Sequence, residues 1–340
     1  MNIVFTLCSN NYLAQATVLG QSIKANVRGA TFVIVLVDKK TTQVDYSTIP
    51  FEVLPIDLVE PGIDDLSKKY DIVELNTCVK PRVFEYLFET RDVDRIVYLD
   101  PDIRVYNEMP EVDRMLNDSD MVLTPHTVTP IPLDGKQPTE NLLLMYGIYN
   151  LGFLAVKRSD ETMRMLKWWK ERTYAGGHRR PDLGMFVDQL YMNLAPILFQ
   201  GVEILSDVGY NMAPWNLHER HLDREGEAWR VNRCHGLSFF HFSSYRIDSD
   251  LWPASAYNRY SIGERPDLVD LVKQYNTELK DAGHASFSKL PCAYGERGAR
   301  VLGSIGPKWR YKSQLIRMAR QAARLLPDSI RRGIGRAMAD

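Results

Sequence analysis

The N-terminal part of the chain alternates short, wholly apolar segments with amphipathic ones, and this alternation restricts its fold more than any other feature. Apolar runs suited to buried strands cover Asn2–Cys8, Phe32–Val37 and Phe51–Ile56. Between the first two, Asn11–Val27 carries apolar side chains at roughly helical spacing. A strand–helix–strand order of this length indicates parallel pairing with right-handed crossovers. We therefore predict an α/β fold with a mixed, mainly parallel central sheet and flanking helices, in which the residues at strand ends are the functional candidates.

The same patterns predict the remaining elements and divide the chain. Helices are expected at Leu75–Thr90 (with Pro81 in its first turn), Asp160–Thr173 (capped by Ser159 or Asp160), Asp182–Leu198 and Pro266–Ala282. Strands are expected at Ile96–Leu99, Met121–Thr124, Asn150–Val156, Val202–Leu205, Trp229–Asn232 and Leu237–Phe242, and loops at Pro125–Pro138 and Tyr174–Pro181. These elements predict a main domain at 1–262, a helix–loop extension at 263–307 and a basic helical tail at 308–340.

One Asp-x-Asp pair stands out among four. Asp100 and Asp102 directly follow the apolar strand Ile96–Leu99, and the proline between them ends that strand. The pairs at 92/94, 118/120 and 248/250 follow no fully apolar strand. Two oxygen donors at the carboxyl end of a strand suit a hard cation, Mg²⁺ or Mn²⁺, with phosphate oxygens completing its shell. The sequence thus predicts a metal site at Asp100 and Asp102.

Three further positions are candidates for chemistry, and each has an ordinary structural alternative. His241 lies in an apolar strand, where a lone histidine is commonly a core group, yet a two-carboxylate site often takes an imidazole as its third ligand. Lys80 starts a helix and is either a surface lysine or a contact for phosphate oxygen. Asp188 and Gln189 stand among apolar residues, which indicates either a site or a buried capping network.

Charge is unevenly distributed, although the net charge is only −1. Residues 308–340 carry nine Lys/Arg against two Asp, a net charge of +7, which leaves −8 for residues 1–307 and argues against a nucleic-acid-binding domain. Within this tail, Ser313–Leu326 has Leu and Met on one side and Arg on the other, which is typical of a helix lying on anionic lipid. We expect residues 313–336 to bind a membrane surface. The alternative is a helix packed on the body or on a second subunit, so the oligomeric state stays open.

Cysteine usage and hydropathy predict the compartment. The four cysteines lie far apart and form no C-x-x-C, which indicates reduced thiols. No run of 18 apolar residues occurs, and the apolar start Ile3–Leu7 is too short for a signal peptide and lacks a basic region before it. We therefore expect a cytoplasmic protein, peripheral on the inner face of the cytoplasmic membrane.

In their order along the chain, the motifs resemble those of the GT-A (Rossmann-like) nucleotide-sugar glycosyltransferases. Among these they are most similar to the glycogenin-like, largely retaining family that includes bacterial lipooligosaccharide galactosyltransferases. The resemblance spans residues 2–262, which would be the catalytic domain. It implies donor binding by the first-strand loop, the metal strand and an Asn-x-Gly segment beside the donor sugar, here Thr6, Leu7, Cys8, Asn11, Tyr12, Tyr98, Leu99, Asn150 and Gly152.

The resemblance also implies roles for the candidate residues. The metal ligands would be Asp100, Asp102 and His241; Lys80 would add positive charge near the diphosphate; Asp188 would contact the sugar and Gln189 would lie close to the anomeric carbon. The family's Gly three residues after the histidine and Lys six residues after it are here Ser244 and Ile247, and Arg246 could take the place of that lysine.

The expected function is a metal-dependent transfer of a sugar from a nucleotide-diphosphate donor, a UDP-sugar, to a glycan or lipid-linked saccharide. The resemblance implies retention of configuration; the alternative, inversion, would require a carboxylate base such as Asp188. The segment 209–220 resembles a variant found in bacterial polysaccharide-cluster transferases, which indicates surface-polysaccharide assembly and makes Trp215 and Asn216 candidates for the acceptor pocket. A sugar nucleotidylyltransferase is an alternative, but Thr6–Tyr12 lacks a Gly-rich basic phosphate loop. A second alternative is an inactive membrane-bound scaffold. The absence of G-x-G-x-x-G and of a P-loop argues against a nicotinamide dehydrogenase and a P-loop ATPase.

Overall fold

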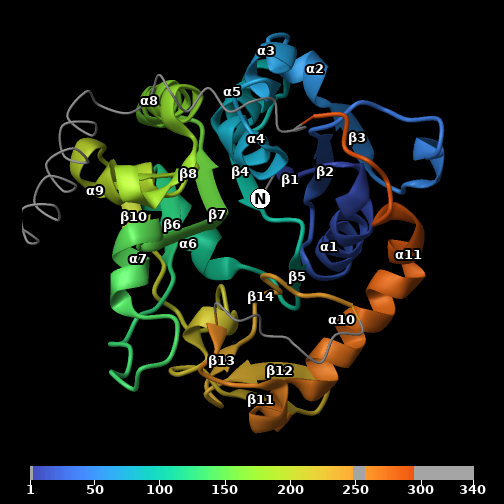
Figure 1. The fold of residues 1–340 in the computed structure, drawn as a ribbon. Coiled ribbons are helices and arrows are strands. Elements are labelled where there is room, and N and C mark those ends of the chain that lie inside the picture. Colours follow the sequence, from blue (N-terminus) through green and yellow to red (C-terminus); the bar gives the residue numbers. More distant parts are fainter. Residues whose placement is uncertain (1–2, 248–256, 295–340) are drawn as a thin grey trace, which may run out of the picture. The chain divides into compact units, whose positions relative to one another are not determined.

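The computed structural model describes residues 3–247 and 257–294, which form a mixture of strands and helices (Figure 1). The first elements are β1 (Ile3–Cys8), α1 (Leu13–Asn26), β2 (Thr31–Leu36), β3 (Glu52–Pro55), α2 (Ile56–Val59), α3 (Ile63–Ser67), α4 (Ile72–Cys78), α5 (Lys80–Thr90), β4 (Arg95–Leu99), β5 (Ile103–Val105), α6 (Pro110–Asp118) and β6 (Met121–Pro125). They are followed by α7 (Glu140–Tyr146), β7 (Tyr149–Lys157), α8 (Asp160–Gly176), β8 (Arg179–Arg180), β9 (Met185–Phe186), α9 (Ala195–Leu198), β10 (Val202–Ile204), β11 (Leu222–Glu225), β12 (Ala228–Val231), β13 (His235–Gly236), β14 (Phe239–His241), α10 (Val269–Asp281) and α11 (His284–Phe287).

Seven strands form the central sheet in the order β10-β6-β7-β4-β1-β2-β3. All neighbouring strands pair in parallel except β7, which runs antiparallel to both β4 and β6. The predicted α/β fold with a mixed, mainly parallel sheet is therefore confirmed. Because β7 runs opposite to its neighbours, its first residues lie at the same edge of the sheet as the last residues of β4 and β6.

Helices cover both faces of this sheet. Along β1, Ile3, Phe5 and Leu7 pack with side chains from α4, α5 and α8, whereas Val4 and Cys8 pack with side chains from α1 and α6. This alternation follows from the two-residue period of a strand and explains why the strands buried on both faces are apolar throughout.

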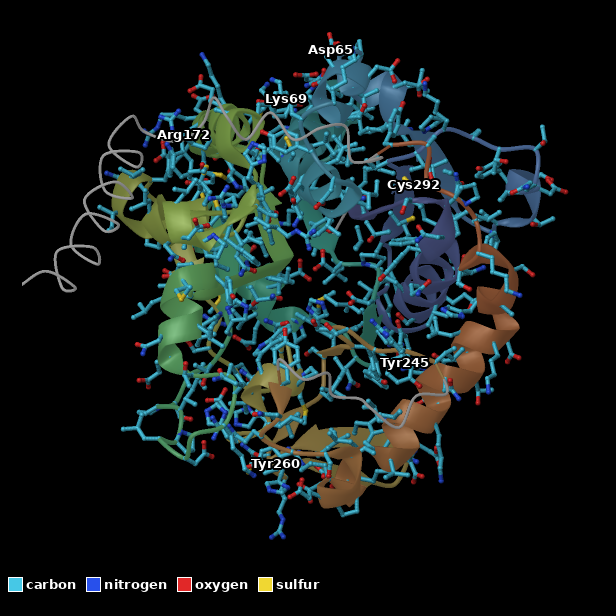
Figure 2. All side chains as sticks on the ribbon, viewed as in Figure 1. Asp65, Lys69, Arg172, Tyr245, Tyr260 and Cys292 are labelled. Carbon is cyan, nitrogen blue, oxygen red and sulfur yellow. The ribbon has the colours of Figure 1, made fainter. Side chains whose placement is uncertain are left out.

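A separate two-stranded sheet, β14 and β5, follows the end of β4. β14 pairs antiparallel with β5, and α10 lies against both, with the Tyr275 ring stacked on Phe242 at 3.8 Å and Glu278 paired with Arg104 at 2.7 Å. Tyr245, labelled in Figure 2, contacts Tyr275 from the loop after β14. Helix α10, in the described part of the predicted 263–307 extension, therefore packs beside β14, which carries His241, and its partner β5.

Two of the predicted helices differ from the observed structure. The segment 75–90 is two helices, α4 and α5, because Pro81 has no N–H with which to continue a helix begun before it. The segment 182–198 is not a continuous helix: Gly184 and Val187 adopt left-handed φ values of 70° and 42°, and only 3₁₀ turns and the short α9 remain helical. Asp188 and Gln189 consequently lie in a tight turn, not on a helix.

The predicted helix at 160–173 is confirmed as α8, and Ser159 is the residue that caps it, since its Oγ accepts the Thr162 N–H at 3.0 Å. None of the helices in the two described ranges is long and apolar enough to cross a bilayer. The predicted amphipathic helix at 313–326 and the rest of the basic tail lie outside the described residues.

Candidate active site

The predicted metal ligands meet at the carboxyl edge of the sheet. Asp100 directly follows β4, Asp102 lies in the turn before β5, and His241 ends β14 beside β5. His241 Nε2 lies 3.0 Å from Asp102 Oδ1 and 3.7 Å from Asp100 Oδ2. The ligand atoms of all three residues lie within 4.8 Å of one another, and this is the group within the described ranges that could hold a metal ion. The carboxylates are partly exposed, whereas the imidazole is buried.

Two neighbours shape this cluster. The Tyr98 hydroxyl donates to Asp100 Oδ1, which leaves Oδ2 facing His241. Burial and the adjacent Asp100 raise the pKa of Tyr98, so the phenol stays a donor. On the opposite side, Gly152 leaves room that a side chain would fill, because a Cβ there would lie 2.6 Å from His241 Cε1 and 2.8 Å from Asp100 Oδ2.

The side chain of Asn150 supports His241 from behind. Asn150 Oδ1 lies 3.3 Å from His241 Nδ1, on the ring side away from the carboxylates. Burial lowers the pKa of His241, but the Asp102 and Asp100 carboxylates outweigh it, so the pKa is raised from its usual value. A cation held by these carboxylates would favour the neutral ring, whose Nε2 lone pair is then a metal ligand.

Lys80 is fully buried and already paired. Its Nζ lies 2.6 Å from Asp188 Oδ2 and donates to the Leu151 carbonyl at 2.8 Å, while the Tyr98 ring lies 4.1 Å away. Burial raises the pKa of Asp188, and Lys80 opposes this shift. The structure thus brings Lys80 and Asp188 together beneath Tyr98 as an ion pair closed to solvent. The contact of Lys80 with phosphate stays a prediction.

Gln189 joins two segments at the rim of the site. Its Oε1 accepts the Leu151 N–H at 3.1 Å, and its Nε2 donates to the Tyr146 carbonyl at 2.9 Å. Gly147 lies directly against it at a left-handed φ of 123°, where a Cβ would come within 2.8 Å of Gln189 Cγ. The amide is therefore held in one orientation next to the start of β7.

The predicted nucleotide loop follows β1. The side chains of Thr6, Leu7 and Cys8 are buried, so only the loop beyond them offers accessible side chains, with Tyr12 44 % exposed. Asp38, two residues after β2, fixes this loop by accepting the Asn10 N–H at 3.1 Å. It also accepts the N–H of Ala293, in the segment after α11, at 2.8 Å. Leu99, also predicted to bind donor, is a buried core residue of β4.

The loop after His241 brings Arg246 near Tyr12 of the predicted nucleotide loop. Burial and Asp102 raise the pKa of Tyr12, while the exposed Arg246 acts on the same phenol in the opposite direction, so all three lie within electrostatic reach. Ser244, in place of the family's glycine, adopts a left-handed φ of 59°. The backbone conformation that a glycine would favour is therefore present despite the substitution.

The segment 209–220 packs against His241 through Trp215. The Trp215 ring contacts the His241 ring edge-to-face at 5.0 Å, and it is buried. Asn216, predicted to contact an acceptor, instead bonds entirely to backbone: its Oδ1 accepts the Ala213 N–H, and its Nδ2 donates to the carbonyls of His126 and Asn211. Asn216 therefore shapes the turn that carries Trp215.

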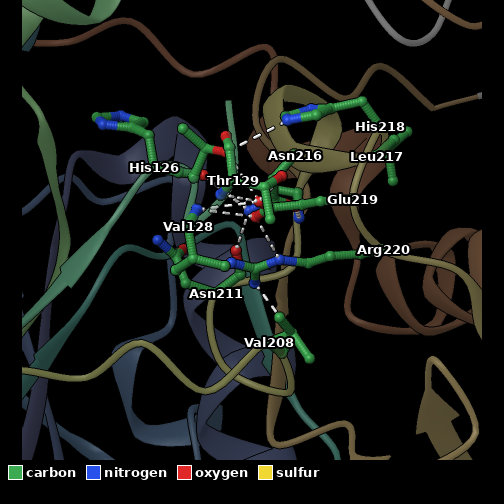
Figure 3. Close-up of polar contacts among 12 residues, drawn as sticks. His126, Val128, Thr129, Val208, Asn211, Asn216, Leu217, His218, Glu219 and Arg220 are labelled. Carbon is green, nitrogen blue, oxygen red and sulfur yellow. Dashed lines mark hydrogen bonds and ion pairs between the residues drawn. The ribbon is translucent and has the colours of Figure 1, made fainter. Parts of the chain in front are cut away.

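Glu219 and Arg220 connect the segment 209–220 to neighbouring loops (Figure 3). The buried Glu219 carboxylate accepts the N–H groups of Val128 (3.0 Å) and Thr129 (2.7 Å) and pairs with Arg220 at 3.1 Å. Arg220 in turn donates to the Val208 and Tyr210 carbonyls. The loop after β6 and the loop before β11 are consequently held together behind the metal cluster.

Two residues of the site were absent from the predictions. Asp38 follows β2, and His126 follows β6, where its Nε2 lies 3.4 Å from Asn150 Nδ2. The signal that singles out Asp100 could have found both, because Asp38 directly follows the apolar run Phe32–Val37 and His126 directly follows β6.

Comparisons with known proteins found relatives in sequence and similar solved structures. No family model matches it. The uncharacterised protein YfnF of Bacillus subtilis is 26 % identical over 252 residues, 72 % of this chain and 82 % of YfnF, and YfnD of the same organism is 19 % identical over 167 residues, 48 % of this chain and 51 % of YfnD.

Among solved structures, the galactosyltransferase LgtC with donor and acceptor sugar analogues is 17 % identical at a TM-score of 0.49, covering 86 % of this chain and 98 % of LgtC. The glycosyltransferase GlyE of Streptococcus pneumoniae is 13 % identical at a TM-score of 0.45, covering 85 % of this chain and 65 % of GlyE. Because both TM-scores lie below 0.5, the function proposed next rests on the site residues.

Proposed function

We propose that the chain is a metal-dependent glycosyltransferase that moves a sugar from a nucleotide-diphosphate donor, a UDP-sugar, to a glycan or lipid-linked saccharide. The observation that carries this proposal is the cluster of Asp100, Asp102 and His241 at the carboxyl edge of the sheet. That edge is where open α/β sheets bind nucleotides. The Lys80–Asp188 pair is buried, and both Lys80 and Gln189 bond to the backbone of Leu151 in β7, the strand next to β4.

The residues of the cluster fit Mn²⁺ or Mg²⁺. Two carboxylates and one imidazole are ligands that Mn²⁺ accepts readily, and Mg²⁺ is commonly held by carboxylates together with substrate phosphates. Gly152 keeps the space between Asp100 and His241 clear. When bound, such a cation would supply positive charge against the charge that develops on the departing diphosphate.

Fixed charges of the chain would assist the same departure. Arg246, exposed and within electrostatic reach of Tyr12, would contact the phosphates and take the role of the family's lysine. Lys80 is closed off by Asp188, so its charge would act across Tyr98 instead of by direct contact. Because a diphosphate is a good leaving group once its charge is offset, no side chain is required as a general acid.

Gln189 and Asp188 would position the sugar. The amide of Gln189 is fixed by its two backbone bonds next to Leu151, and its remaining lone pair could face an oxocarbenium-like centre. Asp188 forms a buried ion pair and is therefore a poor free base. This favours retention of configuration, in which the departing phosphate takes the acceptor proton, over inversion, which would require a carboxylate base.

The acceptor and the location are proposed from the sequence. A role in bacterial-type surface-polysaccharide assembly follows from the segment 209–220, and attachment to the inner face of the cytoplasmic membrane from the basic residues between 313 and 336. Liposome co-sedimentation of the full chain and of a chain truncated at Gly306 tests the attachment. Equal binding of both to anionic vesicles would contradict it.

A panel of nucleotide sugars with Mn²⁺ tests the proposed activity. Donor hydrolysis and thermal shift are measured for the wild type and for Asp102→Asn, which keeps the shape of the side chain but removes its charge. We expect one donor class to stabilise the wild type and to be hydrolysed, with both effects lost in the variant. Absence of any response in the wild type, or an equal response in the variant, would refute the proposal.

A further inference from the structure

Behind the predicted metal ligands, three buried polar side chains form one hydrogen-bonded row. It begins at the Ile148 carbonyl, which lies 3.2 Å from His126 Nδ1. His126 Nε2 lies 3.4 Å from Asn150 Nδ2, and Asn150 Oδ1 lies 3.3 Å from His241 Nδ1. The three residues are 8 %, 6 % and 4 % exposed, so water does not compete along the row.

The row has only one consistent direction. A carbonyl oxygen only accepts, so His126 must donate to it from Nδ1. The neutral ring then has a lone pair on Nε2, which accepts from the amide nitrogen of Asn150. This turns the Asn150 carbonyl oxygen towards His241, whose Nδ1 must donate to it. The remaining Nε2 of His241 is left facing Asp102 and Asp100.

His126 is kept neutral and immobile. Burial lowers its pKa to about 4, so the ring carries no charge at neutral pH. The Trp215 ring contacts the rings of both His126, at 5.2 Å, and His241, at 5.0 Å. Asn216 Nδ2 donates to the His126 carbonyl at 3.0 Å, and Glu219 holds the backbone that follows.

We infer that His126 is a positioning residue which, through Asn150, holds His241 as the Nδ1–H tautomer with its Nε2 lone pair directed at the cation site. The inference rests on the proposed function, because it gives His241 its purpose as a ligand. Without the acceptor on His126, the Asn150 amide is free to turn over and present its nitrogen to His241. His241 then carries its proton on Nε2, where it donates to Asp102 instead of ligating a cation.

Two variants of His126 separate the acceptor from the bulk of the ring. His126→Leu removes both hydrogen bonds, whereas His126→Gln keeps an oxygen acceptor near the position of Nε2. His178→Leu is the matched control, because His178 is equally buried at 8 % exposure and also packs on an aromatic ring, that of Tyr70, but lies outside the row.

The first readout is the tautomer of His241 itself. Long-range ¹H–¹⁵N correlation spectra of ¹⁵N-histidine-labelled full-length protein, recorded without metal at a pH where the rings are neutral, distinguish Nδ1–H from Nε2–H. With seven histidines in the chain, single substitutions assign each signal. We expect Nδ1–H for both His126 and His241 in the wild type, Nε2–H for His241 in His126→Leu, and Nδ1–H for His241 in His126→Gln and His178→Leu.

The second readout is Mn²⁺ affinity without nucleotide. We expect a loss of about tenfold in His126→Leu, as is usual for residues behind a metal ligand, and near wild-type affinity in His126→Gln and His178→Leu. If His126→Leu keeps His241 as the Nδ1–H tautomer, or the Leu and Gln variants behave alike, the inference is overturned. If the wild type shows the expected tautomers but binds no Mn²⁺, the hydrogen-bonded row stands and the proposed metal-dependent function fails.

Discussion

Gly152→Ala is the smallest change that reaches the proposed metal site. Gly152 lies in β7 without a left-handed φ, so alanine fits the backbone there without strain. The added Cβ would lie 2.6 Å from His241 Cε1 and 2.8 Å from both Asn150 Oδ1 and Asp100 Oδ2. All three distances are below van der Waals contact, so the methyl group must displace two proposed ligands and the residue behind one of them.

The expected magnitude follows from these contacts. Overpacking a well-fitted interior costs about 1–3 kcal/mol of folding free energy. Because the displaced groups are the proposed ligands Asp100 and His241, Mn²⁺ affinity should fall further, by about 10–100-fold, which is the usual range for disturbed metal surroundings. Metal-dependent donor hydrolysis should fall in parallel.

Gly236→Ala is the matched control for this substitution. Gly236 also lies in a strand, β13, and a Cβ there would meet only ordinary contacts at 3.8 Å and 3.9 Å. Mn²⁺ titration by electron paramagnetic resonance and denaturant unfolding are measured on both variants. A Gly152→Ala protein with wild-type Mn²⁺ affinity and hydrolysis would refute the assignment of Asp100 and His241 as ligands.

Three further predictions concern buried charges. Lys80→Met and Asp188→Asn should each lower the free energy of unfolding by about 3–5 kcal/mol, because each leaves a buried partner uncompensated. The double variant should lose less than the sum of the two single losses. Additive losses in denaturant unfolding would contradict the pairing. Glu219→Gln should cost about 1.5–3 kcal/mol, since the carboxylate that accepts two backbone N–H groups and pairs with Arg220 becomes neutral; unchanged unfolding would contradict this. Burial lowers the pKa of His126 from 6.5 to about 4, so the unfolded chain binds this proton first and stability is lost as the pH falls from about 6.5 to about 4, by about 3 kcal/mol. His126→Gln should lack that loss, and identical pH profiles of unfolding would contradict the assignment.

Most strands of the central sheet and the two carboxylates of the cluster could be predicted because both depend on local patterns. Apolar runs mark the strands that are buried on both faces, and Asp100 and Asp102 directly follow one of them. His241 could be tied to them only through the order of motifs, since its approach depends on the pairing of β14 with β5, which no local signal specifies.

The surroundings of the site depend on tertiary contacts and were less predictable. The residues around Asp188 have an apolar pattern compatible with a helix, yet Gly184 and Val187 turn the backbone so that Asp188 reaches Lys80. Asn216 has an amide side chain of the kind that often binds ligands, but this amide forms hydrogen bonds with backbone groups. The sequence around His126 shows only that it follows a strand. Its link to His241 runs through Asn150, which reaches His126 because β7 pairs antiparallel with β6.

Electron paramagnetic resonance of Mn²⁺ bound to the full chain in the presence of UDP tests the central proposal most directly. The account predicts coupling of the manganese to one imidazole ¹⁴N, lost in His241→Ala, together with coupling to the ³¹P nuclei of UDP. Bound Mn²⁺ that shows neither ¹⁴N nor ³¹P coupling in the wild type, or an imidazole coupling that persists in His241→Ala, would contradict a nucleotide-sugar site built on Asp100, Asp102 and His241.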